Sequence, residues 1–126
     1  MKKTVTMVAV ACALQGCLSS PQINDIDYAP PSERTRSNAV VYVVGTFWDP
    51  ESIRDPFISG LVRVDDGDYD EVCVRFKARD PQTKYYGLQR ILLRIEKNGS
   101  VSSALNDAPE CRDARLEYIR FDELRR

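Results

Sequence analysis

Apolar and polar residues alternate in two segments of the second half of the chain. In EVCVRFKARD (residues 71–80), one set of alternate positions is apolar: Val72, Val74, Phe76 and Ala78. The other set is mostly basic: Cys73, Arg75, Lys77 and Arg79. LQRILLRIEK (residues 88–97) alternates in the same way, with Ile91, Leu93 and Ile95 on the apolar side. A period of two is typical of a β-strand whose apolar face covers a core, so both segments are predicted to be strands.

Two more strands are predicted after these. Asn98-Gly99 follows the second alternating segment and is the favoured two-residue turn of a β-hairpin. We therefore expect SVSSAL (residues 100–105) to return as an antiparallel strand. RLEYIRFDEL (residues 115–124) fits neither a helical nor a strand period cleanly, and we predict a short strand within it.

The apolar segment SNAVVYVVGTFW (residues 37–48) supports two interpretations. Its many β-branched residues favour a strand. However, Val40, Val43, Val44 and Phe47 have the i, i+3, i+4, i+7 spacing of one helix face, and Ser37 is a suitable N-cap. The residues that follow this segment favour the helix. In that case we expect folded structure to start near Ser37, and Phe47 and Trp48 to lie in the core.

WDPESIRDPFIS, which begins at Trp48, resembles a motif of small bacterial envelope proteins. In that motif a helix ends in LKDPDSAKF, and a pair of strands follows with VCG.VNAKNSFGGYSG. The matching residues here are Asp49-Pro50-Glu51-Ser52-Ile53-Arg54, Val72-Cys73, Ala78 and Tyr86-Gly87. The chain departs from the motif at residues 75–79 and at DPQTK (residues 80–84), where a proline turn replaces a glycine-rich one. The resemblance bears on the fold alone and indicates nothing about an activity.

These elements together predict an α+β fold. We expect a small antiparallel sheet of three or four strands, with one N-terminal helix packed on its apolar face.

The first 16 residues have the three parts of a secretory signal peptide. Lys2 and Lys3 precede an apolar run of about ten residues, which is too short for a membrane span of about 20. The run ends in Leu14-Gln15-Gly16-Cys17, which resembles the lipobox of bacterial lipoproteins. That resemblance implies cleavage before Cys17, a diacylglyceryl group on its sulfur and an acyl chain on its new amine. Several acyl chains on one residue would anchor the protein to a membrane almost permanently.

The position after the cysteine bears on which membrane holds the anchor. In lipoproteins of enteric bacteria, an aspartate there retains the protein at the inner membrane, and here the residue is Leu18. We therefore expect an outer-membrane location on the periplasmic face. Residues 17–36 are polar, contain three prolines and are predicted to be a flexible tether. An alternative is that INDIDYAPP (residues 23–31) is a docking peptide. Residues 37–126 are predicted to form one globular domain.

The periplasm is an oxidising compartment, which determines the expected state of the remaining cysteines. Cys12 lies in the predicted signal peptide, and Cys17 is the predicted lipid site. Cys73 and Cys111 are then the two thiols left, and we expect them to form a disulfide. Because Cys73 lies on the polar face of its strand, the bond would hold the C-terminal segment across that face or around the sheet edge. The rival reading, a redox or metal pair, needs CxxC-like spacing or histidines.

The chain contains no histidine, which excludes Ser-His and Cys-His nucleophile pairs and typical zinc sites. We expect no enzymatic activity, no cofactor and no bound metal. Calcium binding by DDGDYDE (residues 65–71) is the alternative, although the cluster lacks EF-hand spacing and reads as a solvated loop. Removing Lys2 and Lys3 leaves 16 of the 18 basic residues against 19 acidic ones, a side-chain balance of −3. That balance does not suit a nucleic-acid-binding protein.

The best candidate for a binding surface is the polar face of the two long strands. We call the five cations on it the basic stripe: Arg75, Lys77, Arg79, Arg90 and Arg94. It could bind an acidic partner protein, phosphates or peptidoglycan carboxylates, or it could be a solvated face. Tyr85 and Tyr86 could form an aromatic contact site or lie half-buried. The predicted function is an interaction or assembly module of the cell envelope with a protein partner. The alternative is an envelope enzyme or inhibitor.

Overall fold

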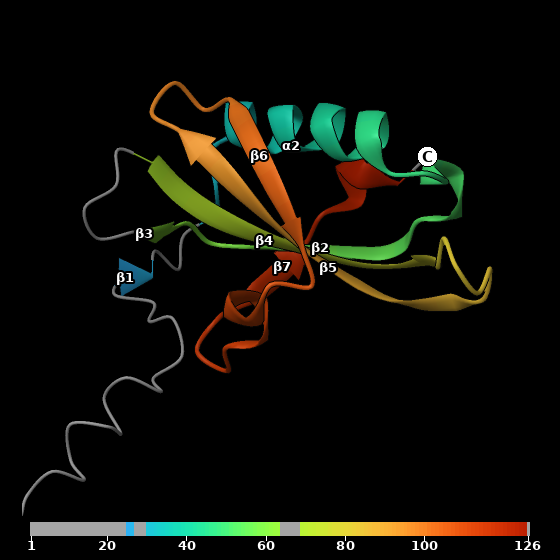
Figure 1. The fold of residues 1–126 in the computed structure, drawn as a ribbon. Coiled ribbons are helices and arrows are strands. Elements are labelled where there is room, and N and C mark those ends of the chain that lie inside the picture. The colour runs from blue at the N-terminus through green and yellow to red at the C-terminus, as the bar shows by residue number, and fades with distance from the viewer. Residues whose placement is uncertain (1–24, 27–29, 64–68, 126) are drawn as a thin grey trace, which may run out of the picture.

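A computed structural model of the chain describes residues 25–26, 30–63 and 69–125. Its 14-residue helix, α2 (Glu33–Thr46), lies along one face of an antiparallel sheet (Figure 1). Three short 3-10 turns connect or end the elements: η1 (Pro50–Ser52), η2 (Pro109–Arg112) and η3 (Asp122–Leu124). The predicted α+β class with an N-terminal helix on the sheet is confirmed.

Within the described residues the sheet has five strands of three or more residues, in the order β7-β2-β4-β5-β6. They are β2 (Arg54–Ser59), β4 (Tyr69–Arg79), β5 (Tyr86–Glu96), β6 (Val101–Asn106) and β7 (Tyr118–Arg120). Two-residue strands extend one side: β3 (Val62–Arg63) pairs with β4, and β1 (Asp25–Ile26) pairs with β3. The prediction of three or four strands is therefore too low.

The strand that was not predicted is β2, because its sequence RDPFIS lacks a regular alternation of apolar and polar residues. Asp55 has a φ of 51°, and the register with β4 shifts between Arg54 and Phe57. Proline removes a backbone donor and is tolerated in sheets at irregularities of this kind. Pro56 therefore sits at a bulge, where the alternation of apolar and polar residues that would identify a strand is broken.

The main core lies between α2 and the sheet. The predicted apolar faces of β4 and β5 are confirmed, because all of their members are buried here: Val72, Val74, Phe76, Ala78, Ile91, Leu93 and Ile95. Ala39 and Val43 of the helix are fully buried against them, together with Ile53, Ile58, Phe121 and Leu124. Phe47 packs edge-on against Phe76, with ring centroids 5.2 Å apart, so the expectation that Phe47 contributes to the core is confirmed.

The helix begins one turn earlier than predicted. Ser32 is its N-cap, because the Ser32 side chain accepts a 3.1 Å hydrogen bond from the backbone N–H of Thr35. Ser37 lies inside the helix and is exposed, so its assignment as the N-cap is wrong. Residues 33–36, and the strand β1, were both assigned to the tether and are part of the fold. The choice between helix and strand for residues 37–46 is settled as helix.

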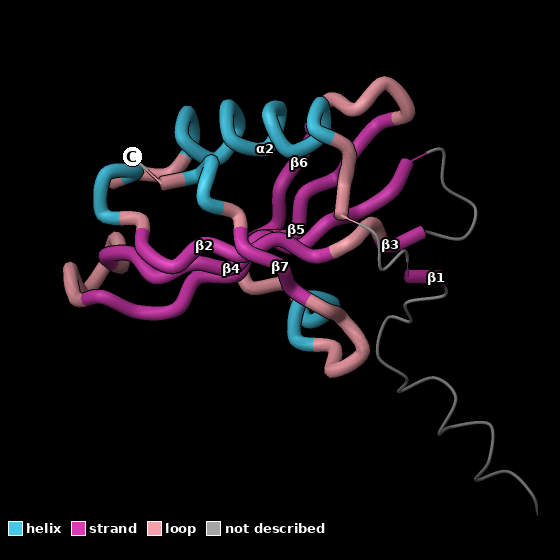
Figure 2. Tube along the Cα trace, turned by 180° about the vertical axis from the view of Figure 1, so that it is seen from behind, coloured by secondary structure: helices cyan, strands magenta, loops and turns pink. Residues whose placement is uncertain are grey.

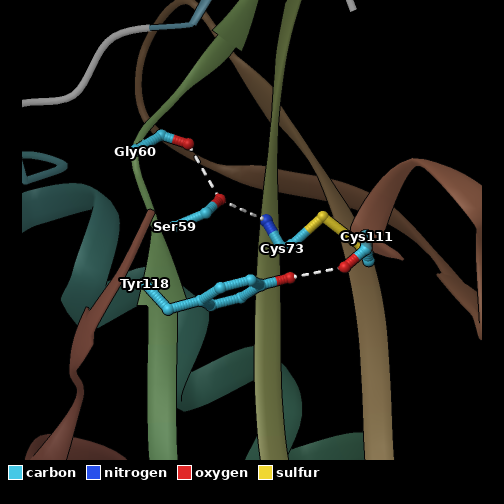
Figure 3. Close-up of a disulfide and its surroundings, with 5 residues drawn as sticks. All are labelled: Ser59, Gly60, Cys73, Cys111 and Tyr118. Atoms are coloured by element: carbon cyan, nitrogen blue, oxygen red, sulfur yellow. Dashed lines mark hydrogen bonds between the residues drawn. A yellow bond between two sulfur atoms is a disulfide. The ribbon is translucent and has the colours of Figure 1, made fainter. Parts of the chain in front are cut away.

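A smaller apolar cluster lies on the opposite face of the sheet. Beyond Asp107, whose φ is 56°, the chain leaves β6 and crosses beneath β4 and β5 (Figures 1 and 2). The predicted disulfide between Cys73 and Cys111 is present and joins the crossing segment to β4 (Figure 3). The buried members of this cluster are Val62, Cys73, Leu92, Ala108, Cys111 and Leu116. The disulfide thus holds the C-terminal segment across the polar face, which is the first of the two arrangements expected from the position of Cys73.

Two buried serines supply hydrogen bonds to β4 where its pairing with β2 stops. The Ser59 hydroxyl accepts from the backbone N–H of Cys73 at 2.9 Å and donates to the carbonyl of Gly60 at 2.8 Å (Figure 3). At the other end, the Ser52 hydroxyl accepts from the backbone N–H of Arg79 at 3.1 Å. Buried backbone donors need such partners, which accounts for buried polar residues in this core.

The β5–β6 hairpin is confirmed as antiparallel, but its turn differs from the predicted two-residue type. The N–H of Gly99 donates to the carbonyl of Glu96, and the N–H of Glu96 donates to the carbonyl of Ser100. A two-residue type I′ turn needs positive φ at both central residues. Gly99 has a φ of 87°, and Asn98 is not among the described residues with positive φ. The wider turn therefore needs one left-handed residue, which glycine supplies.

Candidate functional site

The basic stripe lies on the sheet face opposite α2. Arg75, Lys77 and Arg79 alternate along β4 with the buried residues that face the helix, so they project to the other side. Arg90 of β5 is the direct register partner of Arg75, and Arg94 is that of Glu71. Strand alternation and register together bring four of the five predicted cations from β4 and β5 onto one continuous surface, with Arg79 at the far end of β4.

Arg75 is fixed between two aromatic rings. Its guanidinium carbon lies 4.9 Å from the ring centroid of Phe57 and 4.3 Å from that of Tyr118. These are cation–π distances. The Tyr118 hydroxyl donates a 2.8 Å hydrogen bond to the carbonyl of Cys111 (Figure 3). Burial raises the pKa of Tyr118, while the positive charges of Arg75 and Arg90 lower it, so this hydroxyl stays protonated as a donor.

Three other cations of the stripe have a partner within the domain. Lys77 Nζ lies 3.9 Å from Asp55 Oδ2, Arg79 Nη2 lies 2.5 Å from Asp49 Oδ2, and the Arg94 guanidinium carbon lies 3.8 Å from the ring centroid of Tyr69. The two ion pairs are solvent-accessible and contribute little to stability, but their carboxylates partly neutralise the charges of Lys77 and Arg79. The stripe is therefore less uniform than the sequence suggests.

Arg90 differs from the other members of the stripe. Within the part of the chain that the structure describes, its guanidinium makes neither an ion pair nor a cation–π contact, whereas each of the other four cations makes at least one of these. It lines a pocket of about 430 Å³ together with Arg75 and Arg112. The pocket is also lined by Cys111, Asp113, Ala114, Leu116 and Tyr118. Asp113 is the one carboxylate in this lining, and it is paired with Arg115, which lies outside the lining. We call this the basic pocket.

Arg112 was not among the predicted site residues. It belongs to η2, and its Nη2 lies 2.6 Å from Asp107 Oδ1. Its place beside Arg75 and Arg90 depends on the path of the chain across the sheet. The sequence offered one indication of this position: Arg112 follows Cys111, and the predicted disulfide brings Cys111 and its neighbours to the polar face of β4.

A second surface lies at the end of the β4–β5 hairpin. Trp48, Tyr85, Tyr86 and Leu88 are exposed by 43%, 79%, 56% and 47%. The expectation that Trp48 lies in the core is therefore wrong. Its indole N–H donates a 2.8 Å hydrogen bond to the carbonyl of Arg79, and Lys84 Nζ lies 4.3 Å from its ring centroid. The ring is thus held at the surface. Tyr85 and Tyr86 are both exposed, so the alternative that they lie half-buried is wrong.

A groove of about 690 Å³ separates this surface from the helix. Tyr42, Thr46 and Phe47 of the helix end line one side, and Gln89 and Ile91 of β5 line the other. Trp48 and Leu88 also line it, and Arg90 and Arg112 line both this groove and the basic pocket, so the two adjoin. We call it the edge groove.

Three acidic groups near these surfaces have shifted pKa values, and each shift has a local cause. Hydrogen bonds from Arg115 lower the pKa of Asp113 to about 2, and backbone N–H groups of residues 82 and 83 lower that of Asp80. Burial and the nearby Glu110 raise the pKa of Glu71, against the lowering effect of Arg94. Of the acidic cluster, Asp65, Asp66 and Asp68 lie outside the described residues.

Comparisons with protein-family models, curated proteins and solved structures found no match to this chain. The LQGC string and Cys17 lie outside the described residues. Among the helices of the described part, none is long and apolar enough to cross a membrane. The lipobox and envelope-motif resemblances therefore stay predictions.

Proposed function

We propose that this protein is a lipid-anchored interaction module of the bacterial envelope, and that its basic pocket binds a carboxylate of a partner protein. One observation carries the proposal: Arg90 has neither an ion-pair nor a cation–π partner among the described residues, and it shares a pocket with Arg75 and Arg112. Guanidinium groups bind carboxylates through paired, charge-assisted hydrogen bonds. The cation–π contacts of Arg75 and the ion pair of Arg112 leave Arg90 as the group that binds the ligand directly.

The anchor at Cys17 rests on the signal-like residues 1–16 and on the LQGC string. The disulfide supports an oxidising compartment such as the periplasm. Leu18 in place of aspartate supports the outer membrane. Radiolabelled palmitate is expected to enter the wild-type protein in cells and not Cys17→Ser. Label in that variant would contradict the anchor without touching the binding site.

Binding is tested by substituting two cations on the same face. The full-length protein is purified from detergent-solubilised membranes as wild type, Arg90→Glu and Lys77→Glu. Lys77 is the matched control, because it is an exposed cation of the stripe that does not line the basic pocket. We expect a stoichiometric partner to be retained by Lys77→Glu and lost by Arg90→Glu. Retention by Arg90→Glu would refute the basic pocket as the binding site.

A further inference from the structure

β5 extends beyond the strand that covers its outer side. β6 pairs with Ile91–Ile95 of β5, whereas β5 begins at Tyr86. Figure 1 shows the β4–β5 hairpin continuing past the end of β6. Among the described residues, no strand pairs with residues 86–90 on the side away from β4. We call this segment the free edge.

Backbone hydrogen bonds near the free edge show which backbone groups point outward from it. The carbonyl of Arg90 accepts from the N–H of Asp107 on the outer side, and the N–H of Glu96 donates to the β5–β6 turn. The carbonyl of Tyr85 accepts from the N–H of Asp80 on the β4 side. In an antiparallel strand the N–H and C=O of one residue point to the same side, and successive residues alternate. The N–H and C=O of Tyr86 and Leu88 therefore face outward.

The chain is held away from this edge by its own crossing. At Asp107 a left-handed backbone turn ends β6, and the ion pair with Arg112 and the disulfide of Cys111 fix the segment beneath the sheet. β6 cannot simply extend along residues 86–90. The open edge is thus built into the fold.

Open strand edges are usually protected by short length, bulges or charged side chains. The other edges of the sheet within the described residues follow this rule: β1 has two residues, β7 has three, and β6 has a register shift at its pairing with Arg94 and Ile95. The free edge of β5 continues an 11-residue strand whose pairing with β4 has no register shift, and its one charged side chain is Arg90. Its residues Tyr86 and Leu88 are exposed.

We propose that an extended segment of the partner protein adds to the free edge as a further strand, with an acidic side chain beside Arg90 and apolar side chains in the edge groove. The acidic contact rests on the proposed function, whereas the strand pairing rests on the backbone geometry alone. Backbone hydrogen bonds supply affinity in such strand addition, and pockets for alternate side chains supply specificity.

The register of the sheet determines the pattern of the added segment. Its residue opposite Leu88 lies on the face of Arg90, because directly opposed residues point to the same side of a sheet. Its residues opposite Gly87 and Gln89 lie on the helix side, where Tyr42, Thr46 and Phe47 line the groove. A partner segment with alternating apolar and acidic residues fits both sides.

The probe is the peptide acetyl-Val-Glu-Val-Glu-Val-amide, titrated into the purified full-length protein in detergent. The fluorescence of Trp48, the one tryptophan of the chain, reports on the groove that it borders. We expect saturable binding and slower amide exchange of Leu88. A peptide with lysine in place of glutamate is expected to bind about tenfold more weakly, and so is one that is N-methylated at the amides facing β5.

Two protein variants separate the backbone from the side chain. Leu88→Pro removes the outward N–H, and Leu88→Ala keeps it, so we expect about tenfold weaker binding for proline relative to alanine. Circular dichroism checks that both variants fold, and the N-methylated peptide gives the same test without any change in the protein.

The outcomes distinguish the two proposals. Binding that depends on Arg90, with no protection of Leu88 and no effect of N-methylation, overturns strand addition and leaves the basic pocket standing. Protection of Leu88 that persists in Arg90→Glu supports strand addition and contradicts the role of Arg90. No binding of the glutamate peptide, or equal binding of all the peptides, overturns strand addition.

Discussion

Removal of the disulfide by Cys73→Ala together with Cys111→Ala tests how much of the stability depends on the covalent link. Both cysteines are buried, with 0% and 2% exposure, so alanine avoids placing a hydroxyl in the small apolar cluster. The bond closes a loop with a sequence separation of 38 residues. The chain-entropy relation for a loop of this length gives a loss of about 4 kcal/mol at 25 °C. A small domain has a net stability of about 5–15 kcal/mol, so the loss is large.

Without the disulfide, the crossing segment is held to the sheet by weak noncovalent contacts. The Tyr118–Cys111 hydrogen bond of 2.8 Å and the Arg112–Asp107 ion pair of 2.6 Å remain possible in the variant. The ion pair is exposed and is expected to contribute less than about 1 kcal/mol. We therefore expect the main core beneath α2 to persist and amide exchange to quicken first in residues 107–117.

Urea unfolding followed by circular dichroism measures the effect. We expect the free energy of unfolding to fall by about 4 kcal/mol and the urea dependence to steepen, because the unfolded chain without the crosslink exposes more surface. Wild-type protein in a thiol reductant is expected to resemble the double variant. A loss below about 1 kcal/mol with an unchanged urea dependence would refute the argument from the unfolded state.

Three further substitutions test individual contacts. Ser59→Ala removes the hydroxyl that accepts from the buried backbone N–H of Cys73, which then has no partner. We expect the free energy of unfolding, measured in urea, to fall by about 1–3 kcal/mol. Ser32→Ala removes the N-cap of the helix and is expected to cost about 1 kcal/mol, whereas Ser37→Ala, inside the helix and exposed, is expected to cost less than about 0.5 kcal/mol. Burial and Glu110 raise the pKa of Glu71, so the folded state binds this proton more tightly than the unfolded chain does. Stability therefore decreases as pH rises from the ordinary pKa of 4.5 through the raised pKa of the folded state. Glu71→Gln is expected to raise the melting temperature at neutral pH and not at a pH well below 4.5.

Alternation predicted the faces of β4 and β5 correctly because both strands bury one complete set of alternate residues. The same reasoning placed Cys73 on the face opposite the helix, and the disulfide then determined which face the C-terminal segment crosses. These features follow from local periodicity and from one covalent constraint.

The features that the sequence did not reveal depend on contacts between distant residues. Pro56 and the left-handed Asp55 interrupt the period of β2, and the strand is recognisable by its pairing with β4 and β7 alone. Ser32 and Ser37 are equally suitable caps by residue type. Trp48 counts as an apolar residue in a hydrophobicity pattern, which predicts burial. Its indole N–H donates to the carbonyl of Arg79 in β4, and this bond keeps the ring at the surface.

The predicted and the unpredicted parts of the site meet in the crossing segment. Alternation and register account for Arg75 and Arg90, but the basic pocket also needs Arg112, and the free edge needs β6 to stop at Asn106. Both follow from the turn at Asp107, because the same change of direction that uncovers residues 86–90 carries Arg112 beneath the sheet. The disulfide at Cys111 holds that path. If strand addition and carboxylate binding act together, they share one structural origin, and the oxidised state of the disulfide is what keeps the two sites side by side.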